Sequence, residues 1–250
     1  MSEIRVLLYR NWLEFKRKYI SYILLWFSLP MTIYLFMVIP LSFQISKVDL
    51  MNYRNWVSPG IWICSSAILS FIYSKIKLRN LIYKNNYINK YLKAPISNGQ
   101  LLSSLLFSSF IMGLIQLIIS IVITTSLNND NLNFIQLILI LINITSILVF
   151  FAILGLLCAI YAKDDLVSIF MFLFVLIILF FSIGTLIPLS NSYNKFLMLS
   201  SNLPMYQIVL NVQLLYAGKI AMIYPVVIMN VINIIMFIIV LIMSYKKFRN

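Results

Sequence analysis

The chain has 250 residues, of which 62% are hydrophobic and only 10% are charged, and its mean hydropathy is +1.00. A soluble domain carries roughly 25% charged residues, so this chain has too few polar residues to cover a surface in water. It has no histidine and six acidic residues, and its two cysteines, Cys64 and Cys158, are far apart. Zinc sites and a disulfide framework are therefore excluded, and the composition is that of a membrane protein.

The N-terminal segment, residues 1–19, has the pattern of an amphipathic helix. Apolar side chains recur at helical spacing from Ile4 to Tyr19, and charged side chains fall on the other face. We predict that this helix lies in the membrane interface, with Trp12, Phe15, Lys16 and Arg17 as its interfacial residues. The alternative is a simple anchor that fixes the topology of the first span.

Six stretches without charged residues are long enough, at about 20 residues, to cross a membrane as helices. They predict transmembrane helices at residues 20–43, 56–74, 101–127, 132–162, 166–189 and 220–244. The stretch before the last of them, residues 190–219, is too polar to cross lipid alone. We predict an extracytoplasmic re-entrant region there, marked by Asn202, Pro204, Gln207 and Asn211.

The net charge of +13 follows a topological pattern. Fifteen of the nineteen basic residues lie in the N-terminal segment, in the loops after the second and fourth spans, and at the C-terminus. Cytoplasmic loops keep Lys and Arg, so both termini are predicted to be cytoplasmic and no nucleic-acid partner is needed. Frequent Ile, Asn and Lys indicate an AT-rich genome, hence a bacterial or archaeal plasma membrane. The other four of the nineteen basic residues are predicted to lie on the side opposite the cytoplasm: Lys47, Arg54, Lys195 and Lys219.

The cytoplasmic loop after the second span, residues 79–96, is the most informative segment between spans. It belongs to a basic stretch, from Lys75 to Lys93, that has no acidic residue. Apolar residues recur there at helical spacing, Pro95 ends the pattern, and Ser97 or Asn98 can cap the next helix. We predict either a loop lying against anionic lipid or a short docking helix for a partner protein. The docking residues would be Leu81, Tyr87, Ile88, Lys90, Tyr91, Leu92, Lys93 and Pro95. In the loop after the fourth span, Asp165 is predicted to be a helix N-cap.

The interiors of the predicted spans contain no Asp, Glu, Lys, Arg or His, which disfavours proton-coupled transport. Polar side chains within the spans predict hydrogen bonds between helices, and lining a translocation path is the second interpretation. The candidates for such a path are Gln116, Asn143, Asn230 and Asn233. The chain has no GxxxxGK[ST] loop and is not expected to hydrolyse ATP or to act as an enzyme itself. A pore-forming chain that has neither ion-coupling residues nor an ATPase of its own, but has a basic docking helix, points to energy supplied by another subunit.

This layout resembles the membrane subunit of type-2 ABC exporters, the group of the daunorubicin-type, nodulation-factor and polysaccharide exporters. Three local patterns are similar to the family's: Pro59-Gly60 at the start of the second span, residues 88–97 at the end of the coupling helix, and residues 199–205 before the last span. The sequence departs from the family's Asn-Pro pattern at residues 202–204, where Leu203 separates Asn202 from Pro204. The resemblance covers nearly the whole chain.

The resemblance implies an all-α integral membrane protein with six transmembrane helices, an interfacial helix, a cytoplasmic coupling helix and a re-entrant region, all in one permease domain. It implies pairing with a second permease, either another copy or a sister chain, and with two ATP-binding subunits that hold ATP and Mg²⁺. Residues 81–96 would enter a groove of the ATPase, and the cargo would be amphipathic, lipid-linked, peptide-like or drug-like. This chain itself would hold no cofactor and no metal.

Two other functions remain as alternatives. The first is a non-transporting immunity or scaffold subunit within an ABC complex, which would bind the ATPase without changing cargo flux. The second is a membrane-embedded enzyme acting on lipids, which would need paired carboxylates or histidine near the interface. The acidic residues outside the N-terminal segment are divided between opposite sides of the membrane, which disfavours the enzyme: Asp49, Asp130, Asp164 and Asp165.

Overall fold

The computed structural model describes residues 3–48, 51–84, 97–128, 132–162, 164–188, 200–220 and 222–249. These residues are mostly helical, and five of their helices are long and apolar enough to cross a membrane. The prediction of an all-α, multi-pass membrane protein is confirmed at this level.

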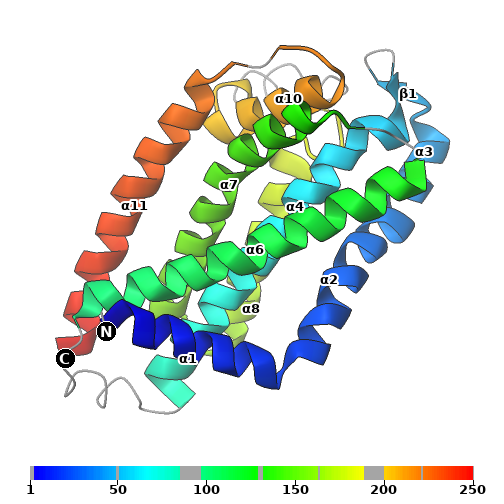
Figure 1. Cartoon of the computed structure of the whole chain (residues 1–250). Helices are drawn as coiled ribbons and strands as arrows, with labels where there is room; N and C mark the ends of the chain where they lie inside the picture. Colours follow the sequence, from blue (N-terminus) through cyan, green and yellow to red (C-terminus); the bar gives the residue numbers. More distant parts are fainter. Residues whose placement is uncertain are drawn as a thin grey trace.

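The first helices form an L-shaped arm at one side of the molecule (Figure 1). Helix α1 (Glu3–Arg17) lies across one end of the bundle, and α2 (Tyr19–Ile33) turns away from it. Helix α2 continues through the π-helix η1 (Tyr34–Val38) into α3 (Ile39–Gln44), so Tyr19–Gln44 forms one apolar rod. A small antiparallel hairpin follows, in which β1 (Lys47–Val48) pairs with β2 (Met51–Asn52).

Helix α4 (Tyr53–Arg79), followed by the π-helix η2 (Asn80–Lys84), forms the centre of the bundle. Of its apolar stretch 94% is buried, against 22% for the last helix of the chain. The buried face carries serines that are small enough to let neighbouring helices approach closely. They are Ser58, Ser65, Ser66, Ser70 and Ser74.

Helices α6 (Asn98–Asn128) and α7 (Phe134–Tyr161) pack against α4. Glycine allows the helices to approach closely at two of the contacts. A Cβ atom at Gly113 would lie 2.0 Å from Ser70 Oγ, and one at Gly155 would lie 2.5 Å from the Phe71 carbonyl oxygen. Because the three helices interlock without space for larger side chains, α4, α6 and α7 form the rigid core of the protein.

Helices α6 and α7 both begin with a capping box. The backbone N–H of Gln100 donates to Ser97 Oγ at 3.2 Å, and the Gln100 side chain accepts from the Ser97 N–H at 2.9 Å. The same reciprocal bonding occurs between Asn133 and Gln136 at the start of α7. The predicted cap at Ser97 is therefore confirmed, and it fixes where α6 begins.

The segment predicted as a span at residues 166–189 is helical for only part of that length. Helix α8 (Asp165–Ile177) continues as the π-helix η3 (Ile178–Ser182), and its apolar part, Asp165–Phe180, is shorter than the five long helices. Beyond Ser182 the chain is no longer helical, although it stays buried as far as Leu186.

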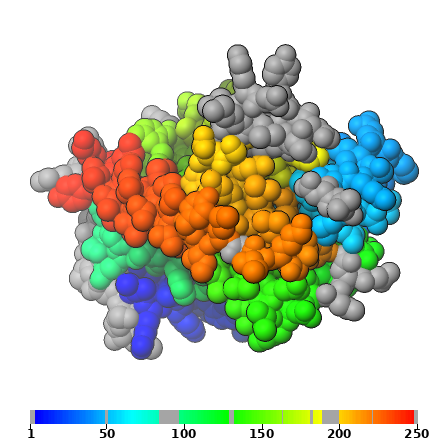
Figure 2. Space-filling model, turned by 90° about the horizontal axis from the view of Figure 1, so that it is seen from above, coloured from blue at the N-terminus to red at the C-terminus, as the bar shows by residue number. Residues whose placement is uncertain are grey.

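The last two helices complete the bundle. Helix α10 (Pro204–Tyr216) lies across the end opposite α1, and α11 (Tyr224–Arg249) runs back along the outside (Figure 1). Seen from above, the orange segments, α10 and the first part of α11, cover the face between the hairpin and the rest of α11 (Figure 2). The start of α1 and the end of α11 lie at the same end of the molecule (Figure 1). We call this the α1 end and the opposite one the α10 end.

Candidate functional sites at the two ends of the bundle

Helix α1 is attached to the bundle by side chains four residues apart along one of its faces. Leu7 is buried, and Asn11 Nδ2 donates a hydrogen bond to Ser108 Oγ of α6 at 2.9 Å. The ring of Phe15 lies 5.4 Å from that of Tyr22 and 5.7 Å from that of Trp26, both on α2. Of the other predicted interfacial residues, Trp12, Lys16 and Arg17 are exposed. Their position at a membrane surface stays a prediction.

Glu14 links α1 to the end of α4. Its carboxylate pairs with Lys77 of α4 and accepts a hydrogen bond from Arg10 Nε at 3.1 Å. Burial raises the pKa of the Glu14 carboxyl, but the hydrogen bonds and charges of Lys77 and Arg10 outweigh burial and leave the pKa below its ordinary value. The predicted polar face of the amphipathic helix is thus partly a contact with the bundle.

Asp165 makes a second ion pair at the α1 end, with Arg79 of α4. The prediction that Asp165 is the N-cap of its helix is wrong. Asp164 occupies the cap position, without a side-chain hydrogen bond, and Asp165 is the first helical residue. Its carboxylate points instead to the basic end of α4, a contact between residues 86 apart in sequence that local capping patterns do not reveal.

Lys75 is a buried cation that the sequence analysis placed in a loop. It lies within α4, and its side chain is almost fully buried between α4 and α8. Nζ donates a hydrogen bond to the Ser168 carbonyl oxygen at 2.5 Å and lies 5.5 Å from the Phe71 ring centre and 5.7 Å from that of Phe172. The sequence contains one signal of this burial. Lys75 follows Phe71 by four residues, so the two side chains lie on the same face of the helix, and that face is buried.

The predicted docking segment is bracketed by described residues at the α1 end. Leu81 is buried in a cluster that includes Leu7 and Leu102, and Tyr83 OH donates to the Ile160 carbonyl oxygen at 3.0 Å. The other predicted docking residues lie outside the described residues: Tyr87, Ile88, Lys90, Tyr91, Leu92, Lys93 and Pro95. The described residues on either side of it, Leu81 and Leu101, therefore pack in one cluster with residues of α1, α7 and α11.

A buried non-helical segment, residues 183–187, is the main feature toward the α10 end. Tyr53 OH donates to the Leu186 carbonyl oxygen at 2.6 Å, and Gln213 Nε2 donates to that of Gly184 at 3.5 Å. Thr185 accepts from Cys64 Sγ at 3.2 Å. Irregular backbone within a membrane protein needs such shelter, because lipid offers it no hydrogen bonds.

Gly60 of α4 makes room for this segment. A Cβ atom there would lie 1.8 Å from the Thr185 carbonyl oxygen. Gly184 has a φ angle of +69°, which favours glycine at the bend. The predicted span at residues 166–189 did not include this break, although Ser182, Gly184 and Thr185 interrupt the apolar run and could have signalled it.

The residues predicted to mark a re-entrant region hold α10 in place. Pro204 is the first residue of α10, directly after a turn that contains Asn202, and Gln207 Nε2 donates to the Ser201 carbonyl oxygen at 3.1 Å. Asn211 bonds both backbone groups of Met222: it donates to the carbonyl oxygen at 2.6 Å and accepts from the N–H at 3.3 Å. This paired bond connects α10 to the segment before α11.

Glycine ends α10. Gly218 has a φ angle of +75°, its N–H bonds the Leu215 carbonyl at 3.0 Å, and the Lys219 N–H bonds that of Leu214 at 2.8 Å. This is the Schellman pattern, which satisfies the last carbonyl groups of a helix. Helix α10 therefore has a defined stop before the chain turns into α11.

The four polar candidates within the predicted spans do not meet in one place. Gln116 Nε2 donates to the Trp26 carbonyl oxygen of α2 at 3.1 Å, and Asn233 Nδ2 donates to that of Ser146 on α7 at 2.9 Å. Asn143 bonds only within its own helix among the described residues. Gln116 and Asn233 thus connect helices, the role that polar side chains usually have in membranes.

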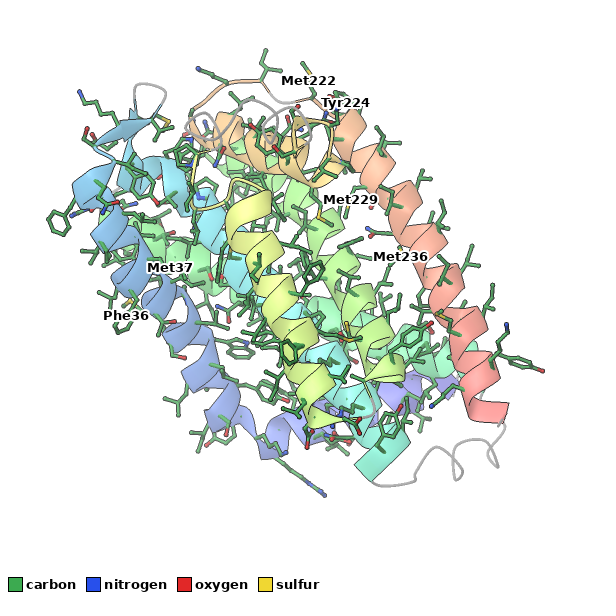
Figure 3. The ribbon with its side chains drawn as sticks, turned by 180° about the vertical axis from the view of Figure 1, so that it is seen from behind. Phe36, Met37, Met222, Tyr224, Met229 and Met236 are labelled. Carbon is green, nitrogen blue, oxygen red and sulfur yellow. The ribbon has the colours of Figure 1, made fainter. Side chains whose placement is uncertain are left out.

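Asn230 and Asn233 also line an open groove of about 770 Å³ between α1, α6, α7 and α11. Its other lining side chains are almost all apolar, with Ser103 as the exception. Met229 and Met236 lie on the side of α11 that faces the bundle (Figure 3). Helix α11 therefore stands partly away from the core, with apolar space beside it.

Comparison of the chain with protein-family models, with curated proteins and with solved structures found no match. Within the described part of the chain, no group of three or more His, Cys, Asp or Glu side chains could hold a metal ion. Function is therefore inferred from the sequence pattern and from the geometry at the two ends of the bundle.

Proposed function

We propose that the chain is the membrane subunit of an ATP-driven ABC exporter, energised by separate ATP-binding subunits. The observation that carries the proposal is the composition of the α1 end. Helix α1, the end of α11, and the two elements that flank the predicted docking segment, η2 and the start of α6, all lie there (Figure 1). A cytoplasmic ATPase would need these elements on one face. The residue patterns at 57–61, 88–97 and 199–205 support the same assignment.

Six crossings fit this arrangement better than five. The start of α1 and the end of α11 lie at the same end, which requires an even number of crossings. Asp165–Ser182 has 18 residues and would rise about 27 Å as a helix, close to the roughly 30 Å of a bilayer core. We assign α8 and η3, extended by residues 183–187, as the sixth crossing. This assignment places both termini in the cytoplasm by the distribution of Lys and Arg.

The contacts at the α1 end suggest how a partner could act on the spans. The docking segment continues directly from α4 through η2, and α4 is bound to α1 through Lys77 and to α8 through Lys75 and Arg79. A push on the segment would move these helices together as a rigid body, the hinge type of transition. The cargo would be amphipathic, lipid-linked, peptide-like or drug-like, moved out of the cytoplasm or the inner leaflet.

The test is co-purification of an ATPase. The chain, tagged at its C-terminus, is solubilised from its native host in mild detergent, and bound P-loop ATPases are identified by mass spectrometry. Leu92→Asp places a charge on the apolar side of the predicted docking helix, so the ATPase should be lost. Lys47→Asp, a change at the opposite end, is the control and should retain it. Absence of an ATPase from the wild-type protein would refute the proposal.

A flux measurement separates an exporter from an immunity or scaffold subunit. The complex is reconstituted in liposomes, and movement of fluorescent lipid, peptide and drug probes is followed with and without ATP. An exporter should move at least one class in an ATP-dependent way, and Leu92→Asp should abolish that movement. A complex that hydrolyses ATP but moves none of the probes would favour the scaffold function.

A further inference from the structure

A groove lies between the C-terminal ends of α7 and α11, on a different side of α11 from the groove that contains Asn230. Its volume is about 670 Å³, within the range of roughly 300–1,000 Å³ that is usual for ligand sites. The wall is apolar along most of its length, and two lysines stand at the end nearest the C-terminus. The lining residues are Ile160, Ile239, Ile242, Met243, Lys246 and Lys247, with Tyr161 beside them.

The side chains around the lysines are held in place. Tyr161 OH lies 3.4 Å from the Met243 sulfur atom, which connects the two helices across the groove. Lys247 Nζ lies 5.8 Å from the ring centre of Tyr83, whose hydroxyl is bonded to the Ile160 carbonyl oxygen. The charged end of the groove is thus built from η2, α7 and α11 together.

Neither lysine has an acidic partner within the described part of the chain. The ion pairs there engage Glu14 and Asp165 with Arg10, Lys77 and Arg79. Lys246 and Lys247 are both exposed, so their charges are available to a ligand. The groove therefore offers two positive charges and an apolar surface, and it complements an anionic group that carries a hydrocarbon chain.

The depth of the lysines agrees with a lipid headgroup. They are the first charged residues after the long apolar run at residues 220–244. Basic residues directly after such a run lie at the level of the phosphates, and basic pockets between transmembrane helices bind anionic headgroups. A second copy of this chain, with nineteen basic residues against six acidic ones, offers less negative charge to these lysines than an anionic headgroup does.

We propose that this groove binds one anionic phospholipid, with its phosphate at Lys246 and Lys247 and an acyl chain along Ile239, Ile242 and Met243. The proposal does not depend on the exporter function. Through η2 and the ends of α7 and α11, the bound lipid would hold together the elements from which the docking segment starts.

The test uses the full-length protein, delipidated in detergent and analysed by native mass spectrometry. Phosphatidylglycerol and phosphatidylcholine with identical acyl chains are titrated separately. Two lysines near the surface should give phosphatidylglycerol an advantage of about tenfold or more for one bound molecule. Lys246→Gln with Lys247→Gln should remove that advantage. Lys47→Gln with Arg54→Gln removes two exposed charges at the opposite end and should retain it.

A second pair of variants tests the apolar wall. Ile242→Trp fills the groove and should weaken the binding of both lipids, whereas Ile235→Trp, on an exposed part of α11 outside the groove, should not. Thermal unfolding confirms that each variant is folded. Equal affinity of the wild-type protein for the two lipids, or an unchanged preference in the lysine variant, would overturn the proposal. Displacement by millimolar inorganic phosphate, with no effect of Ile242→Trp, would assign the site to a free anion and overturn it as well.

Discussion

The clearest single-residue requirement in the structure is the absence of a side chain at Gly60. The position faces a backbone carbonyl, that of Thr185, which cannot move aside as a flexible side chain could. The segment that carries this carbonyl is itself fixed by Tyr53, Cys64 and Gln213. One methyl group at Gly60 must therefore displace main chain.

We expect Gly60→Ala to destabilise the protein by about 1–3 kcal/mol, the cost of overpacking a well-packed core. Thermal unfolding in detergent measures the change. Gly99→Ala is the matched control, because a Cβ atom there would meet ordinary contacts no closer than 3.8 Å. Equal midpoints for the two variants would contradict the packing of residues 183–187 against α4.

Glu14 gives a pH dependence whose sign follows from its lowered pKa. The ionised carboxylate stabilises the contact of α1 with α4 at pH values above the unfolded-state pKa, close to 4.5. That stabilisation is lost as the pH falls through the lower folded-state pKa. The stability difference between wild-type protein and Glu14→Gln should thus be present at pH 7 and shrink below about pH 4.5.

Unfolding midpoints at pH 7, 5, 4 and 3 test this expectation. Asp164→Asn is the control, since Asp164 is exposed and forms none of the described ion pairs, so it should leave the pH profile unchanged. A constant difference between wild type and Glu14→Gln across the pH range would exclude the Glu14–Lys77 pair as the source.

At the scale of the elements, α4 combines deep burial with polar side chains. It is the most buried of the long helices, yet it carries a row of serines and a lysine. Four of the five serines bond within the helix or to a neighbour, as Ser65 Oγ does with Ser120 Oγ at 2.7 Å, whereas Ser70 Oγ has no partner among the described residues. Polar groups inside the bundle cost little when they are bonded in this way, and they bring the helices closer together.

Substitutions at Lys75 test whether its positive charge or its apolar volume holds α8 against α4. Lys75→Met keeps the volume and removes a buried charge, an exchange that is often neutral or stabilising. Lys75→Glu places a carboxylate against a carbonyl oxygen and two aromatic faces, so it should destabilise by several kcal/mol. Lys47→Glu, an exposed change, is the control in the same unfolding assay. A large loss of stability in Lys75→Met would show that the charge itself holds α8.

The connection of α10 to α11 depends on Asn211. Asn211→Leu removes both hydrogen bonds to Met222, whose exposed backbone can partly turn to water, so we expect a loss of about 1 kcal/mol. Limited proteolysis between residues 217 and 223 should become faster in that variant. Gln207→Leu removes one bond at the other side of α10 and should leave this cleavage rate unchanged.

The sequence predicted elements whose cause is local and missed those whose cause is tertiary. Long apolar runs located the five long helices, and the Ser97–Gln100 spacing located the start of α6. The break after Ser182 depends on shelter from α4 and α10, which no local pattern contains. The burial of Lys75 and the pairing of Asp165 likewise depend on which helices become neighbours.

At the scale of the whole molecule, the proposed six crossings predict which residues share a side of the membrane. Single cysteines at Lys47 and Lys219 should react with an impermeant thiol reagent added to intact cells, and one at Lys246 should react only after lysis. The native cysteines, Cys64 and Cys158, are first replaced by serine or alanine, so that only the introduced cysteine can react. Cys64 is buried and Cys158 is half-buried. If cysteines at positions 47 and 246 reacted from the same side of the membrane, the assignment of α8 as a crossing would be contradicted.

The contrast in burial between α4 and α11 also bears on biogenesis. Helix α4 is the least apolar of the five long helices and gains its stability from α6 and α7, which are synthesised after it. A translocon that releases helices into lipid by their own apolarity would release α11 readily and would hold α4 until its neighbours arrive. We therefore expect α4, α6 and α7 to leave the translocon as one group, with cooperative membrane insertion at the centre of this protein and autonomous insertion at its edge.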